Sequence, residues 1–196
     1  MTSYRVELFK TDKSKIVHFL TKDLNTPSYP SDSETFYVED GDALMYTLSL
    51  IPGNFRLIAI KVLDLLQKKS NLVFSTDMHF PDSVKSSERA RRGSSKKLLL
   101  EGVNTRKPPD FKEFLTNGEN KLQMFNLMKR VWTDDECAAR LLNKTRIIIN
   151  EGIAHEITSA EGKFVTTKVI TELNSNQEET DYRQVLYLFY AKKKMI

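Results

Sequence analysis

Short apolar segments typical of β-strands alternate along this chain with helical patterns, and this alternation limits the folds open to it. Strands are predicted at Tyr4–Phe9, Thr35–Val38, Leu72–Ser75, Arg146–Asn150, Ile153–Thr158 and Phe164–Ile170. Helices are predicted at Phe55–Leu66, at Asp110–Trp132 with an interruption near Asn117-Gly118, after the capping box Thr133–Glu136, and at Asn176–Lys192. The pattern indicates an α/β domain with a mostly parallel central sheet and flanking helices.

The length of 196 residues suits one domain with an arm. Residues 21–34 are rich in Ser, Thr and Pro, so we expect an N-terminal arm and linker over 1–34 and a domain over 35–196. No run approaches the roughly 20 apolar residues of a membrane helix, and the start of the chain is too polar for a signal peptide. The single cysteine, Cys137, excludes an intramolecular disulfide and favours a nuclear or cytoplasmic, intracellular location.

Charge is distributed unevenly along the chain. The net charge is +4, yet the segment Ser83–Lys107, here called the basic segment, carries eight basic and two acidic residues and is therefore +6 by itself. The stretch Ser31–Asp42 has five acids and no base. This separation suits a protein that binds phosphates with one region and a cation with another.

Acidic residues follow two of the predicted strands and open the last helix. Asp40 follows the first domain strand, Asp77 follows the next, and Glu178, Glu179 and Asp181 begin the C-terminal helix. Side chains at the carboxyl ends of parallel strands meet at one edge of a sheet, and oxygen ligands suit Mg²⁺ or Mn²⁺. Each acid also has a purely structural interpretation, because Asp40-Gly41 is a common turn pair, Asp77 can cap a loop, and acids favour a helix start.

The basic segment begins with a helical pattern. Lys85, Arg89 and Arg92 are spaced by four and three residues and so share one helical face, which can follow a phosphate backbone. The alternative interpretation is a solvated surface helix.

Three short segments, in this order, carry a resemblance to a known family. Val38–Leu44 places an aspartate before a glycine and an apolar helix, Phe74–Gly93 delivers an aspartate into a loop before a basic helix, and Ser175–Arg183 reads Ser-Asn-Gln-Glu-Glu-Thr-Asp-Tyr-Arg. Together they resemble the flap-endonuclease-like branch of the PIN-domain superfamily. The last segment is similar to a Gln-Glu-Glu-Ala-Asp-Thr-Arg type found in animal proteins often associated with mobile elements.

The resemblance implies a PIN-like fold and a divalent-metal-dependent, structure-specific nuclease that hydrolyses phosphodiester bonds. It implies that Asp40 and Asp77 are catalytic metal-site carboxylates, joined by Glu179 and Asp181 as a pair two residues apart and by Glu178 beside them. Two Mg²⁺ or Mn²⁺ ions about 3.5–4 Å apart would activate water and stabilise the leaving oxygen. Lys85, Arg89 and Arg92 would be arch residues that hold the scissile phosphate and the threaded strand. The full set of candidate nucleic-acid-binding residues in the basic segment is Lys85, Arg89, Arg91, Arg92, Lys96 and Lys97.

The resemblance also shows where this chain departs from the family. The family continues with a strand that bears an Asp-x-Asp pair, whereas this sequence stops at Ile196, so we expect a PIN-like domain that lacks its C-terminal portion. The leading hypothesis is a nuclease, or a degenerate relative of one, with branched or single-stranded DNA favoured over RNA as its nucleic-acid partner. The alternatives are a non-catalytic nucleic-acid-binding or scaffold module and a protein-interaction domain.

Overall fold

A five-stranded sheet forms the centre of the protein, whose computed structural model describes residues 35–78, 95–178 and 180–194. The strands lie in the order in which they occur in the sequence, β1 to β5. The strands β1, β2 and β3 are parallel to one another, whereas β4 is antiparallel to β3 and β5 is antiparallel to β4. Their bounds are Phe36–Asp40, Asn71–Ser75, Thr145–Asn150, Ile153–Thr158 and Thr166–Val169. The predicted α/β class with a mostly parallel sheet is therefore confirmed, the sheet being mixed.

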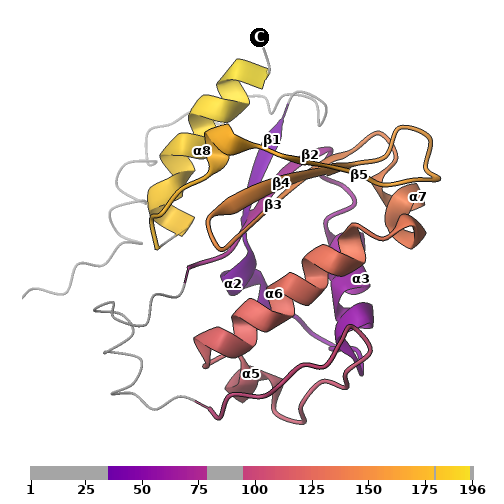
Figure 1. The fold of residues 1–196 in the computed structure, drawn as a ribbon, viewed down its shortest axis with the longest axis vertical. Helices are drawn as coiled ribbons and strands as arrows, with labels where there is room; N and C mark the ends of the chain where they lie inside the picture. The colour runs from indigo at the N-terminus through magenta and orange to yellow at the C-terminus, as the bar shows by residue number, and fades with distance from the viewer. Residues whose placement is uncertain (1–34, 79–94, 179, 195–196) are drawn as a thin grey trace, which may run out of the picture. The chain divides into compact units, whose positions relative to one another are not determined.

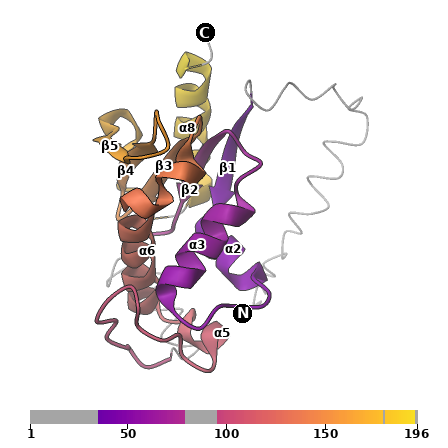
Figure 2. The same ribbon diagram turned by 90° about the vertical axis from the view of Figure 1, so that its right-hand side faces the viewer.

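Helices cover both faces of this sheet. Figures 1 and 2 show α3 and α6 against one face and α8 against the other. The helices among the described residues are α2 (Gly41–Thr47), α3 (Phe55–Leu65), α5 (Phe111–Phe114), α6 (Gly118–Trp132), α7 (Ala138–Leu141) and α8 (Thr180–Lys194), with short 3₁₀ helices η2 (Asp135–Cys137) and η3 (Thr171–Leu173). Within these residues, no helix combines the length and apolar character needed to cross a membrane.

The central strands read as continuous apolar runs because both of their faces are buried. On β2, Leu72 and Phe74 belong to the cluster under α3 and α6, while Val73 belongs to the cluster under α8. The strand β3 alternates in the same way, and its Ile148 lies beside Phe74 in the parallel register. The alternation of side chains along a strand thus divides the apolar residues between two cores.

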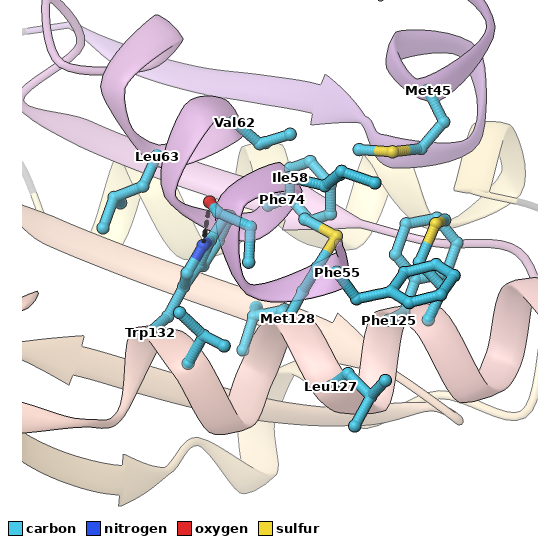
Figure 3. Packing of buried hydrophobic residues seen from close by; sticks show 14 of the residues in the cluster. Met45, Phe55, Ile58, Val62, Leu63, Phe74, Phe125, Leu127, Met128 and Trp132 are labelled. Carbon is cyan, nitrogen blue, oxygen red and sulfur yellow. Dashed lines mark hydrogen bonds between the residues drawn. The ribbon is translucent and has the colours of Figure 1, made fainter. Parts of the chain in front are cut away.

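The larger core lies between the sheet and the helices α3 and α6 (Figure 3). The Trp132 ring is fully buried, contacts Phe74 edge-on at a centroid distance of 5.2 Å, and donates a hydrogen bond from Nε1 to the Ala59 carbonyl at 2.9 Å. That bond satisfies the indole N–H inside an apolar environment. It also ties the end of α6 to the middle of α3.

Several predicted helix ends match the structure, and two differ. Asn117 does interrupt the predicted long helix, because its side chain accepts hydrogen bonds from the first N–H groups of α6. Thr133, however, does not cap the next helix: its hydroxyl donates back to the carbonyls of Lys129 and Arg130, and Asp134 is the N-cap of η2. The C-terminal helix begins at Thr180 rather than at residue 176.

Gly41, the first residue of α2, permits the close approach of this helix to β2. A Cβ at this position would lie 2.6 Å from the Phe74 ring and 3.1 Å from the Thr76 methyl group. Because Phe74 is packed between Phe125 and Trp132, its ring has little room to move.

We therefore predict that Gly41→Ala lowers the free energy of unfolding by about 1–3 kcal/mol through overpacking. Gly53→Ala is the matched control, because a Cβ at that position meets no atom within 4 Å. Its expected effect is within about 0.5 kcal/mol. Chemical denaturation of both variants measures the difference, and equal stabilities would contradict the proposed contact.

Candidate functional site

The carboxyl ends of β1 and β2 lie side by side at one edge of the sheet. In the parallel register Asp40 is opposite Ser75, and Val38 is opposite Val73. The first two strands of the domain are therefore adjacent and parallel. Asp40 and the loop that carries Asp77 consequently leave the sheet at the same edge.

Asp40 is the N-cap of α2. Its Oδ1 accepts a hydrogen bond of 3.1 Å from the Ala43 N–H, which is the usual role of aspartate at a helix start. Partial burial raises the pKa of this carboxyl group above its usual value, and the nearby charges of Asp42 and Asp77 raise it further against the lowering effect of the Ala43 bond. Negative charge is thus concentrated where β1 and β2 end.

Asp42 is a buried acid that the sequence analysis did not single out. Its Oδ1 accepts from the Lys121 ammonium group at 2.5 Å, and its Oδ2 accepts from the Asp77 N–H at 2.8 Å. The two ionic side chains are only 10% and 9% exposed. Lys121 shares one face of α6 with Phe125 and Met128. A single lysine within an apolar helical face is the sequence feature that could have indicated a buried ion pair.

Asp77 joins the loop after β2 to the start of α8. Its Oδ1 accepts from the Thr180 N–H at 3.0 Å across 103 residues of sequence, and the Met78 N–H donates to the Glu178 carbonyl at 2.7 Å. Asp77 therefore has a structural role as a cap, here for the first turn of α8. The same contacts bring the first turn of that helix to the sheet edge.

A buried polar network lies beneath these acids. The Arg183 guanidinium donates to the Thr76 carbonyl at 2.5 Å and to the Thr180 hydroxyl at 3.2 Å. The Ser75 and Tyr187 hydroxyls are 2.6 Å apart, and burial raises the pKa of Tyr187. These bonds fix the direction in which α8 leaves the edge.

The structure brings some of the predicted site residues together and does not describe others. Asp40, Asp77 and the first turn of α8 meet at one edge, and Glu178 takes part through its backbone carbonyl. Within the described ranges, no group of three or more His, Cys, Asp or Glu side chains forms a metal site. Glu179, the side chain of Asp181, and Lys85, Arg89, Arg91 and Arg92 lie outside the described residues.

The last part of the basic segment is described, and it runs along the start of α6. The Leu98 N–H donates to the Asn120 side chain and the Leu100 N–H to that of Gln123. Lys96 and Lys97 are exposed, and Lys97 forms an ion pair with Glu119. Of these two predicted nucleic-acid-binding residues, Lys97 thus already has an acidic neighbour.

Comparisons of this chain with protein-family models, with curated proteins and with solved structures find no match. The features of this protein that indicate its function are therefore the geometry at the sheet edge and the sequence of the basic segment.

The buried pair of Asp42 and Lys121 leads to a test of stability. Lys121→Met would leave a buried carboxylate without its cation, and we expect it to lower the free energy of unfolding by about 3–5 kcal/mol. Adding Asp42→Asn should recover much of this loss, because Asn removes the charge and keeps an acceptor for the Asp77 N–H.

Lys97→Met serves as the matched control for this test. The side chains of Lys97 and Glu119 are 63% and 61% exposed, so loss of their ion pair should cost less than about 1 kcal/mol. Urea denaturation of the three variants provides the comparison. A Lys121→Met protein as stable as Lys97→Met would show that the buried pair contributes little.

Proposed function

We propose that this protein is a divalent-metal-dependent nuclease domain acting on phosphodiester bonds, with its site at the carboxyl edge of β1 and β2. The observation that carries the proposal is the position of Asp40 and Asp77 at the edge to which the first turn of α8 is bonded, together with the raised pKa that Asp40 acquires from burial and from its acidic neighbours. A cation between these carboxylates would offset their repulsion. The PIN-like identity of the fold belongs to the same proposal.

The carboxylate oxygens of the described residues could bind one divalent ion better than two. Asp40 and Asp77 each accept a backbone N–H at Oδ1, and the Asp42 N–H also interacts with the Asp40 carboxylate; the Oδ2 atoms of the two acids are the candidate ligands. Asp42 is neutralised by Lys121 and is the least suitable of the three. Glu179 and Asp181 would complete the ligand set. A bound Mg²⁺ or Mn²⁺ would polarise a phosphoryl oxygen and make its water ligand a better nucleophile.

The protein's own residues would hold and orient the substrate. Lys85, Arg89 and Arg92 share a helical face by their sequence spacing, and each would neutralise one phosphate of a DNA strand. Phosphate contacts position a strand without reading its bases, so we expect selectivity for structure rather than for sequence.

The second candidate is a non-catalytic nucleic-acid-binding module, and one observation favours it. The Lys121 ammonium group already compensates Asp42, and Asp77 is engaged by the Thr180 N–H, so the edge holds together without a metal ion. In that case the basic segment would still bind nucleic acid, but no cation would be needed and no strand would be cut. The presence or absence of Mn²⁺-dependent cleavage separates the two candidates.

A thermal unfolding experiment tests the metal site. If Mn²⁺ is present at about ten times its dissociation constant, binding to the native state alone adds about 1.4 kcal/mol, or a Tm rise of about 3–6 °C. Asp40→Asn and Asp77→Asn should together abolish the rise. Asn retains a side-chain oxygen for each backbone N–H, so both caps can persist without the charge.

Glu161→Gln is the control for the metal experiment, because Glu161 is exposed on the turn between β4 and β5. It should keep the full Tm rise.

Since the pKa of Asp40 is raised, its protonation on acidification should reduce the Mn²⁺ effect at a higher pH than for an ordinary aspartate. An unchanged Tm at millimolar Mn²⁺ in the unmodified protein would count against the metal site and favour the non-catalytic module.

The salt dependence of DNA binding tests the basic segment. Replacing Lys85, Arg89 and Arg92 by Ala should reduce the slope of log affinity against log salt by about 2–3, given roughly 0.7–0.9 per phosphate contact. Fluorescence anisotropy on a 5′-flap duplex and on a single strand measures the slope.

The control for this experiment replaces three exposed lysines outside the basic segment, namely Lys68, Lys112 and Lys163. It removes the same charge from the protein and should leave most of the slope intact. If both triple variants lose the same slope, DNA binding is a response to net charge, and the basic segment is a solvated surface.

A further inference from the structure

The helix α8 has one face against the sheet and another that is apolar and exposed. Tyr187 and Tyr190 are buried, and they pack with Val73, Ile147 and Ile149 on the sheet face opposite α3 and α6 (Figures 1 and 2). The other face carries Val185, Leu188 and Phe189, which are 59%, 66% and 68% exposed. We call these three residues the outer α8 patch.

The spacing of the outer α8 patch makes it continuous. Residues 185, 188 and 189 are three and four positions apart, so their side chains are neighbours on one helical surface. Single exposed apolar residues are common on proteins, but a contiguous group of large ones marks an interaction surface. The patch does not contribute to either core of the described fold.

The distribution of charge along α8 indicates which partner fits this patch. By sequence, Glu178, Glu179 and Asp181 stand at its start. Lys192, Lys193 and Lys194 stand in its last turn, and of these Lys193 already forms an ion pair with Glu172 of the same chain. A helix of this kind is complementary to itself when two copies run antiparallel, because the acidic start of each then meets the basic end of the other. The opposed helix dipoles favour the same arrangement.

We propose that the outer α8 patch is a homodimer interface, in which α8 of a second copy of this chain packs antiparallel against it. The contact is isologous, as a two-fold symmetric dimer requires. The patch centres near residues 188 and 189, so those residues lie close to the symmetry axis, while Val185 of one copy lies near Lys192 of the other. Three large side chains from each copy make a small interface, and the dimer is therefore dependent on concentration.

Sedimentation velocity across micromolar to sub-millimolar concentrations tests self-association of the full chain. The mass should rise from 22.6 kDa toward twice that value. Phe189→Glu and, independently, Leu188→Glu should each weaken the dimer at least about tenfold. Both residues are exposed, so the variants should keep the parent's circular dichroism and Tm.

Phe164→Glu is the matched control, because Phe164 is also 68% exposed but lies between β4 and β5. It should dimerise like the parent. A parent protein that remains monomeric throughout the series would overturn the proposal and would leave the patch to another occupant, such as residues 1–34 or a different protein. A dimer that Phe189→Glu and Phe164→Glu weaken equally would also overturn it.

Disulfide cross-linking tests the orientation of the two helices. The native Cys137 is buried, so introduced cysteines dominate the reaction. Leu188→Cys should form a covalent dimer under mild oxidation, whereas Val169→Cys on β5, which is 45% exposed, should not. When Val185→Cys and Lys192→Cys proteins are mixed, the mixed dimer should exceed either homodimer. Preferential formation of the two homodimers would show a parallel arrangement and refute the antiparallel one.

Discussion

The buried ion pair between Asp42 and Lys121 is the interaction on which the arrangement of the sheet edge depends. Three separate parts of the chain meet at it: α2 supplies the carboxylate, α6 the ammonium group, and the loop after β2 the N–H of Asp77. A carboxylate so deeply buried needs both its cation and its hydrogen-bond donor. Because both oxygens of Asp42 are satisfied, the backbone of Asp77 is held in place, and Asp77 can in turn hold the first turn of α8.

The acids at the sheet edge therefore differ in how far their charge is compensated. Asp42 is compensated from within the protein, while Asp40 has acidic neighbours and a raised pKa. The nuclease proposal and the non-catalytic alternative differ only in what compensates the remaining charge. A divalent ion would do so in the first, and protein groups, including the N–H at the start of α8, would suffice in the second.

The sequence was enough to predict the elements whose signal is local. Apolar runs identified β2 and β3, the apolar pattern identified α3, and Asn117 marked the start of α6. The placement of Asp40 and of the loop after β2 at one edge follows from the rule that parallel strands end at the same edge. The start of α8 was misplaced because the backbone at Ser175 and Glu178 bonds instead to Gly152 and Met78, which are distant in sequence.

Local sequence patterns also could not predict which charged residues are buried. Lys121 resembles a solvated lysine until α2 is placed beside it, and Arg146 is the second residue of β3 but is fully buried. Its guanidinium donates to the carbonyls of Leu66 and Ser70, at the end of α3 and in the turn before β2. Both side chains satisfy partners 76–80 residues away in the chain, so only the tertiary structure identifies their role.

The attachment of α8 also has a consequence for how the chain is made. Its anchoring bonds join Asp77 to Thr180 and Ser75 to Tyr187, over 103 and 112 residues. During synthesis, β1 to β4 and the helices α3 and α6 can assemble before α8 is made, but the sheet face bearing Val73, Ile147 and Ile149 stays uncovered until residues 180–194 have emerged. Contacts of such long sequence separation form late. The nascent protein therefore exposes an apolar sheet surface during the last part of its translation, between the synthesis of β3 and that of α8, and chaperones would have access to it in that interval.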